Sequence, residues 1–337
     1  MSKREIWIDV AKGLGIIAVV LGHSNPDSTV SHYIYWFHMP LFFFLSGYTF
    51  KTISSGQELL GWVKRRSKQL LIPYLSFGLV ITVLEFAKEL KNGHLDMNIL
   101  LKDLGNLIYG GQMLTGGYAV FWFVTCLLIT QVVFAVLTTL VKGVPFQIAI
   151  IIALYLLAHI ETTVYPNANI PLNADVTMLA MTYYAAGYYT KPLLQKLFES
   201  KFILLFALII PALLFSGDYF KLFHYSLDMK VLEYTSWVMD LIIPITMTLA
   251  FSIICYWIAR AKSIAKVFSY IGLMSLTIMY MHFPINLIAE EVIGKHGAIQ
   301  FLLLGCIVPA IIHSVLDKIT LAKVLFLGSG NKKAYAA

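Results

Sequence analysis

Residues 6–23 read IWIDVAKGLGIIAVVLGH, an apolar stretch interrupted by Asp9, Lys12 and His23 at its end. Hydrophobic residues make up 59% of the 337-residue chain and charged residues 13%, whereas soluble domains carry roughly 25% charged residues. So little charge cannot cover the surface of a soluble domain of this size, so lipid must solvate most of the chain. The sequence therefore predicts an all-α polytopic integral membrane protein.

Further apolar segments predict about ten transmembrane helices in total. The predicted spans are 6–23, 33–50, 70–86, 119–141, 146–158, 176–190, 202–215, 236–258, 268–288 and 298–316. With a cytoplasmic N-terminus, 18 Lys and Arg residues fall inside, 6 fall in the outer loops, and Lys12 lies within the first span. This bias is the positive-inside pattern, so we expect both termini in the cytoplasm and interpret the net charge of +7 as topology, without a nucleic-acid partner.

The polar segments predict a single membrane-embedded domain over residues 1–337, with no fused extracytoplasmic domain. The glycine-rich segment 109–118 lacks the phosphate-loop pattern, and we interpret it as a tightly turned loop. The three cysteines lie in apolar runs without close spacing, which predicts packing residues, with neither disulfides nor a metal site. Asp9 and Lys12 interrupt the first apolar run, so we expect a retained helix there and no cleaved signal peptide.

The first helix carries a polar stripe. Successive residues turn by about 100°, which places Lys12 within about 20° and Asp9 within about 40° of His23 on one face. Lys12 and His23 are separated by about 16 Å along the axis. Ionisable groups are costly within lipid and often functional there. The alternative is that Asp9 and Lys12 form an interfacial pair and His23 an interfacial helix end.

Two further histidines stand beside helix-breaking residues. His38 precedes Pro40 in the second span, and His282 is followed by Pro284 in the ninth. An opened helix is tolerated in a membrane where it is buried in protein or faces water. A histidine hydrogen-bonded to a neighbouring carbonyl is the simpler alternative for His38. We assign no role to the remaining histidines, which fall in loops or near span ends: His32, His94, His159, His224, His296 and His313.

The expected topology separates two groups of polar residues. The outer halves or ends of the helices hold His23, His38, Trp122, Asn173, Asp175 and His282. A basic cluster containing Arg65, Arg66 and Lys68 lies at the cytoplasmic end of the third span. The cluster could bind the phosphates of a nucleotide-bearing donor, for which arginine is well suited. Alternatively, it reflects only the positive-inside rule.

These residues resemble the acyltransferase-3 family of bacterial membrane proteins, in which a basic residue is followed by ten residues and a histidine. Lys12 and His23 have this spacing, with Lys where Arg is common, so charge is kept and the bidentate fork is lost. The other matching segments, in order along nearly the whole chain, are Phe37–Tyr48, the basic cluster running into Ile72-Pro-Tyr74, Trp122-Phe123, Asn173-Ala-Asp175, Tyr183–Gly187, and Ser275 with Tyr280-Met-His282.

The resemblance implies an enzyme of the bacterial cytoplasmic membrane. It would transfer an acetyl or other short acyl group from cytoplasmic acyl-CoA to an extracytoplasmic or lipid-linked glycan, with no bound cofactor. Acylation would be direct or pass through a separate extracytoplasmic transferase. His23 would be the general base or carry the acyl group itself, and Asp9 and Lys12 would line the donor's path. The acceptor site would comprise His38, Trp122, Asn173, Asp175, Tyr280 and His282.

Two other classes of protein remain open. A transporter or flippase of a polar or glycolipid substrate would also explain broken helices and buried polar groups. We detect no internal repeat that would favour it. A sensor or structural subunit would leave the outer histidines without a role.

Overall fold

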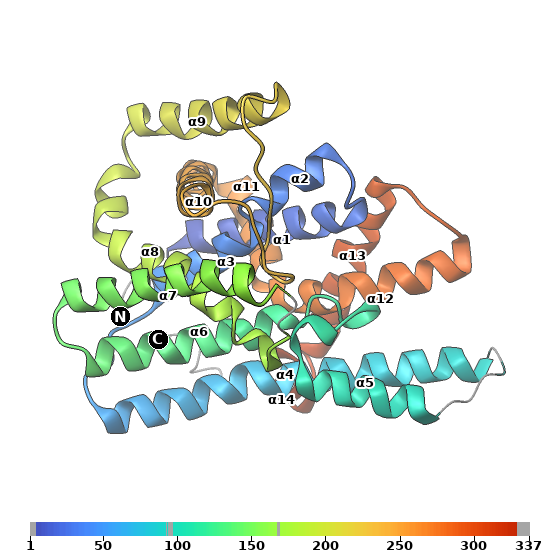
Figure 1. Cartoon of the computed structure of the whole chain (residues 1–337). Helices are drawn as coiled ribbons and strands as arrows, with labels where there is room; N and C mark the ends of the chain where they lie inside the picture. The colour runs from blue at the N-terminus through green and yellow to red at the C-terminus, as the bar shows by residue number, and fades with distance from the viewer. Residues whose placement is uncertain (1–4, 92, 94–96, 167–168, 329–337) are drawn as a thin grey trace.

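The computed structural model describes residues 5–91, 93, 97–166 and 169–328. It is a bundle of helices of very different lengths (Figure 1). In chain order the helices are α1 (Ile6–Ser24), α2 (Thr29–Tyr35), α3 (His38–Thr49), α4 (Gly56–Lys91), α5 (Met97–Tyr109), α6 (Trp122–Leu140), α7 (Val144–Val164), α8 (Val176–Leu197), α9 (Lys201–Tyr219), α10 (Met239–Ile258), α11 (Lys262–Leu273), α12 (Ser275–Ile293), α13 (Ala298–Leu316) and α14 (Thr320–Leu327).

Helix α1 lies in the middle of the bundle and packs against α10, α11 and α13 (Figure 1). Its closest neighbour is α11, where Gly13 faces the carbonyl of Phe268 and Gly272 faces the carbonyl of Asp9. A Cβ atom at either glycine would overlap these carbonyls. Small residues allow backbones to approach closely and are a common basis of helix association in membranes. The glycines thus fix how α1, with its polar stripe, sits in the bundle.

A second close crossing joins α3 to α8. Gly47 lies against the carbonyl of Tyr184, and Gly187 lies against the carbonyl of Phe44. Both glycines belong to segments that the sequence analysis singled out. Their role here is packing, because each leaves no room for a side chain at the crossing.

The outermost helices face lipid. Seven helices are long and apolar enough to cross a membrane, or up to eight if the bent pair α11–α12 counts as one span, within the residues described. The buried residues of α9 are Ala207 and Gly217, and those of α13 are Gly305 and Pro309. The remaining, mostly apolar surface of these helices is suited to acyl chains. The chain is thus an all-α polytopic membrane protein, as predicted.

Helices lie at all ten predicted positions, but several boundaries differ. The short segments predicted at 146–158 and 202–215 extend to 21 and 19 residues as α7 and α9. The predicted span 33–50 is not continuous, because Phe37 leaves the helical conformation between α2 and α3. The predicted span 268–288 bends by 68° between α11 and α12. Pro40 lies in the first turn of α3, where a missing N–H group costs little.

Three loop segments meet at the end of the bundle where α1 ends. One contains the short 3₁₀ helices η1 (Gly111–Met113) and η2 (Gly116–Tyr118), and another contains η3 (Pro171–Asn173). The third is a hairpin of β1 (Leu227–Asp228) and β2 (Glu233–Tyr234), in which Leu227 pairs with Tyr234. The side chain of Lys230, at the hairpin turn, donates to the carbonyl of Leu114 (2.6 Å). We call these three segments the loop layer.

Candidate functional site

Three histidines from three helices converge beneath the loop layer. His23 ends α1, His38 begins α3, and His282 lies in the middle of α12. The Nδ1 atom of His23 lies 3.0 Å from Nε2 of His282, and their rings are parallel with centroids 5.2 Å apart. The His38 ring stands nearly perpendicular to that of His23, at 6.1 Å. His38 and His282 are buried, whereas His23 is partly exposed, so His23 is the member open to a ligand.

The hydrogen bonds determine which ring nitrogens carry protons. Nδ1 of His282 lies 3.0 Å from the carbonyl oxygen of Ile278, and a carbonyl can only accept. Nδ1 of His282 therefore donates, which makes Nε2 of the neutral ring an acceptor. Nδ1 of His23 must then donate to it, so the Nε2 atom of neutral His23 keeps its lone pair. This is the arrangement of a general base whose tautomer is set by a partner.

His38 shows both features considered from the sequence. Its Nδ1 donates to the carbonyl of Ile34 (3.0 Å), as in the simpler alternative. This hydrogen bond fixes the orientation of the ring and places its proton on Nδ1, so Nε2 of the neutral ring is unprotonated. The His38 ring packs beside that of His23. A hydrogen bond to a neighbouring carbonyl is therefore how the site orients His38, and it does not argue against a role there.

Further residues that the sequence analysis did not identify complete the wall of the site. The rings of Tyr35 and Phe283 lie 6.0 and 4.9 Å from that of His23. The charge of Lys230 also acts on His23. Burial lowers the pKa of Lys230, and the nearby Asp228 carboxylate partly offsets this effect. A lysine in a polar loop gives no sequence signal for such a position, because the hairpin alone brings it to α1.

The predicted acceptor residues Asn173 and Asp175 belong to the loop layer. The Asn173 side chain donates to the carbonyl of Lys230 (3.3 Å), and its backbone has a positive φ of 53°. Asp175 is buried and caps α8, accepting from the Val176 N–H group (2.9 Å). Its other oxygen has no hydrogen-bond partner among the residues that the structure describes. Trp122 is buried at the start of α6, the helix that follows η2. Asn173 thus links two segments of the loop layer, and Asp175 stabilises the start of α8.

Tyr280 is not part of the histidine cluster. Two residues along a helix differ by about 200°, which places Tyr280 on the face of α12 away from His282. Its ring stacks with that of Phe77 (4.9 Å) and lies 4.5 Å from that of Phe121. Tyr280 thus packs in an aromatic core between α12, α4 and the start of α6, although its hydroxyl has no hydrogen-bond partner within the described part of the chain.

Asp9 and Lys12 lie near the other end of α1, and both are partly exposed and engaged in interactions. Beside them, Glu5 accepts hydrogen bonds from the indole of Trp7 and the hydroxyl of Tyr48, both at 2.8 Å. Lys191 donates to the Tyr48 carbonyl (3.0 Å). This end of α1 is therefore polar as well.

The basic cluster on α4 divides into inward and outward members. Arg65 and Lys68 are exposed, whereas Arg66 points into the bundle. Its Nε donates to Gln131 (2.6 Å), and the Gln131 amide donates to the Ser46 hydroxyl (2.6 Å). Gln131 lies buried in an apolar span and was not identified from the sequence. The structure thus links Arg66 to the inside of the bundle and leaves the other two at the surface.

The sequence also did not predict a buried pair formed by His159 and Asp240. Nε2 of His159 lies 3.0 Å from the Asp240 carboxylate, and both side chains are almost fully buried. Asp240 also accepts from the Ser236 N–H group, and its carbonyl accepts from the Tyr183 hydroxyl. A carboxylate inside a predicted span was the available signal. The pair ties α7 to the start of α10.

The fold and the site together define a polytopic membrane protein with a cluster of three histidines held within its helices. A family model described as an acyltransferase domain matches residues 5–316. The chain belongs to the acyltransferase-3 family, as its resemblance predicted.

Two curated relatives share part of this sequence. The nodulation protein NolL of Sinorhizobium fredii is 32% identical over 164 residues, which cover 45% of this chain and 43% of NolL. NolL of Mesorhizobium japonicum is 30% identical over 149 residues, covering 41% and 37%. The matches thus span less than half of these relatives. No solved structure matches.

Proposed function

We propose that the protein is a membrane O-acyltransferase. It moves an acetyl or other short acyl group from cytoplasmic acyl-CoA to a hydroxyl group of an extracytoplasmic or lipid-linked glycan in the cell envelope. The observation that carries this proposal is the His23–His282 hydrogen bond (3.0 Å), which leaves Nε2 of His23 able to accept a proton. Membership in the acyltransferase-3 family supports the chemistry.

In the proposed reaction, Nε2 of His23 takes the proton of the acceptor hydroxyl as its oxygen attacks the thioester carbonyl. The new ester bond forms as the bond between the carbonyl carbon and sulfur breaks. The departing CoA thiolate then receives the proton from His23, which restores the neutral ring. His282 is the positioning residue, because its Nε2 accepts from Nδ1 of His23 whether His23 is neutral or protonated. His38 orients the acceptor from the side.

The donor is proposed to enter at the Arg66 end of the bundle, which the charge distribution assigns to the cytoplasm. Guanidinium groups bind phosphate oxygens in charge-assisted hydrogen bonds. Arg66 is the inward member of the basic cluster, and its hydrogen bond from Nε to Gln131 holds the guanidinium in place, which supports this role. Asp9 and Lys12 lie between this end and His23 along α1, and we propose that they line the thioester's path.

The acceptor is proposed to bind under the loop layer on the extracytoplasmic side. Tyr35 beside His23 offers an aromatic face, and Asn173 and Lys230 offer polar groups from the loops. Sugars are suited to this combination of aromatic and hydrogen-bonding groups. The enzyme would lie in the bacterial cytoplasmic membrane with both termini in the cytoplasm. Transfer would be direct or through a separate extracytoplasmic transferase.

Acyl transfer can be tested with membrane vesicles of defined orientation from the source cells. Inside-out vesicles expose the proposed donor side, so acetyl-labelled CoA added outside them should place alkali-labile label in the glycan fraction. Right-side-out vesicles should do so only after permeabilisation. Vesicles from a deletion strain provide the control. Movement of an unmodified glycolipid without ester formation would contradict the proposal and support a flippase.

A further inference from the structure

Outside the histidine site, two histidines and a carboxylate gather at the same end of the bundle. His32 lies in α2, Asp218 in the last turn of α9, and His224 in the segment that leads to the hairpin. Nε2 of His32 lies 3.0 Å from one Asp218 oxygen, and Nδ1 of His224 lies 3.6 Å from the other. One ligand atom from each residue lies within 4.8 Å of the other two.

The two nitrogen–oxygen distances, 3.0 and 3.6 Å, are close to the spacing of neighbouring ligand atoms around a metal ion. Zinc–ligand bonds of 2.0–2.1 Å in a tetrahedron place neighbouring ligand atoms roughly 3.4 Å apart. The two imidazole rings are nearly parallel, with an interplanar angle of 11° and centroids 5.8 Å apart. Each ring presents one nitrogen to the Asp218 carboxylate, Nε2 from His32 and Nδ1 from His224. The three ligand atoms lie within 4.8 Å of one another, so a cation could lie among them once the exposed His224 side chain moves closer to the other two.

The carboxylate is already held in place. One Asp218 oxygen accepts from the Tyr225 N–H group (3.1 Å), and the Asp218 side chain is only 8% exposed. Such outer hydrogen bonds orient carboxylate ligands in metal sites. His32 is in turn packed against the ring of Trp36 (5.6 Å). Two of the three ligands are thus fixed before a metal binds.

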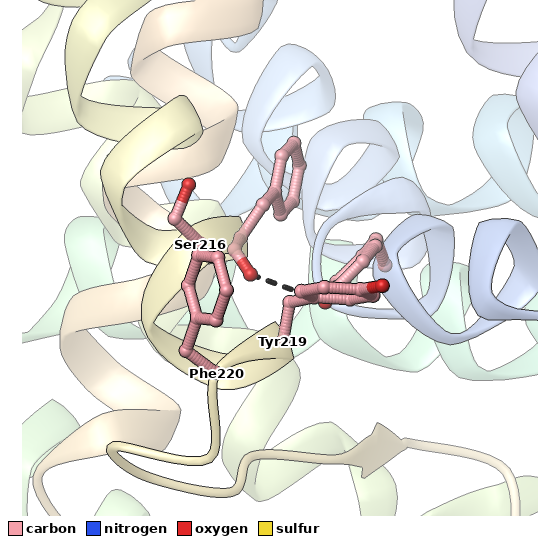
Figure 2. A pocket seen from close by; sticks show the side chains of 5 residues that line it. Ser216, Tyr219 and Phe220 are labelled. Carbon is pink, nitrogen blue, oxygen red and sulfur yellow. Dashed lines mark hydrogen bonds between the residues drawn. The ribbon is translucent and has the colours of Figure 1, made fainter.

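Open space adjoins the cluster. A cavity of about 430 Å³ is bordered by His32 and Asp218, together with the polar turn at Asp27 and Ser28. It shares Tyr33 and Tyr219 with a neighbouring, more apolar pocket, in which the Tyr33 hydroxyl donates to the Phe215 carbonyl (Figure 2). Water can therefore reach the fourth position of a tetrahedral metal.

We propose that His32, Asp218 and His224 bind a zinc ion with water as its fourth ligand. Two imidazoles and one carboxylate form a ligand set that suits zinc better than magnesium or calcium. The ion would join α2, which connects His23 to His38, to the segment that carries Lys230. It would thus hold the outer wall of the histidine site to the loop layer. This inference does not depend on the acyl chemistry.

Zinc binding can be measured directly. The full-length protein, purified in detergent with a histidine-free tag and stripped with EDTA, is titrated with zinc chloride in a calorimeter. We expect one ion per chain. His224→Ala and Asp218→Asn should each weaken binding by more than the roughly 10–100-fold typical when only a group bonded to a ligand is lost. His296→Ala, a control at another loop histidine, should keep the wild-type affinity.

The variants are chosen so that folding does not obscure the result. The His224 side chain is 78% exposed, and Asn at position 218 can still accept from Tyr225. Zinc should also raise the thermal unfolding midpoint of the wild type but not of His224→Ala, because a ligand stabilises the state that binds it. No zinc uptake by the wild type, or equal affinity in His224→Ala, would overturn the proposal.

Discussion

At the scale of single residues, the chemistry of His23 depends on the two acceptors next in line. The Ile278 carbonyl takes the Nδ1 proton of His282, and Nε2 of His282 takes the Nδ1 proton of His23. Both donor–acceptor distances are 3.0 Å, a normal length for a hydrogen bond. Replacing either acceptor by a donor would reverse the direction of these hydrogen bonds. Two successive hydrogen bonds between neutral groups thus set the tautomer of the proposed base, and neither requires a buried charge.

A pair of substitutions at position 282 separates this role from simple packing. Glutamine can place its carbonyl oxygen near the position of Nε2 and accept from His23, whereas leucine fills space but cannot accept. We expect His282→Gln to retain much of the activity. His282→Leu should lower kcat by up to roughly 10²–10⁴-fold, the range of general acid–base catalysis, with little change in KM. Label-transfer rates at several pH values would measure both.

Equal activity of His282→Gln and His282→Leu would show that this histidine only packs. A changed pH profile in His282→Leu, at unchanged thermal stability, would support its action through His23. The two variants are close in volume, so cavity effects should be similar.

Residue type and helical position predicted the histidine cluster, but they did not predict the other residues that surround it. His23, His38 and His282 stood out because ionisable groups are rare inside membrane-spanning helices. Lys230 and Tyr35 carried no such signal, because a polar loop and an aromatic at a helix end are ordinary. His159 was dismissed as a span-end residue, since its partner Asp240 is 81 positions away in the sequence. Pairs of this kind require the fold.

At the scale of helices, close crossings place the residues of the site. The α1–α11 crossing has a glycine on each helix, at Gly13 and Gly272, and the α3–α8 crossing has Gly47 and Gly187. The first positions His23 and the second positions His38. Neither crossing was predicted, because a glycine in an apolar run does not reveal its partner. The breaks at Phe37 and between α11 and α12 likewise interrupt two spans that were predicted to be continuous.

The α1–α11 crossing can be tested with one methyl group. A Cβ at Gly272 would overlap the Asp9 carbonyl, so Gly272→Ala must push the helices apart. We expect a loss of about 1–3 kcal/mol, the usual cost of overpacking. Gly61→Ala in α4 is the matched control, since nothing lies within 4 Å of a Cβ there. Thermal unfolding in detergent would compare them, and equal midpoints would show that the crossing tolerates separation.

At the scale of the whole molecule, polar groups lie at both ends of the helix bundle, and α1 runs between them. Arg66, Gln131 and Ser46 lie at one end, and the three histidines lie under the loop layer at the other. The sequence predicted this division from charge counts and helix order. It did not predict that only one of the three basic residues would point inward, because side-chain direction depends on how α4 is rotated against α6.

The inward direction of Arg66 makes a specific prediction for donor binding. Arg66→Gln should weaken binding of CoA by at least about tenfold, since charge-assisted contacts contribute about 1.5–3 kcal/mol. Arg65→Gln, an exposed neighbour with the same change in charge, should have a smaller effect. Arg66→Lys should recover only part of the affinity if the bidentate fork matters. Titration of purified protein in nanodiscs measures all three, and a larger effect at Arg65 would move the donor site to the outside of α4.

The central claim is that His23 performs the proton transfer, and His23→Gln tests it most directly. Glutamine is polar and similar in size but cannot act as a base. His313→Gln is the control, because His313 is a span histidine that bonds Thr277 (2.8 Å) outside the cluster. Alkali-labile acyl groups are measured on envelope glycans of a deletion strain complemented with each variant at matched protein levels. The account predicts that His23→Gln lowers the rate of esterification by roughly 10²–10⁴-fold while His313→Gln restores it. Normal ester content with His23→Gln would contradict it.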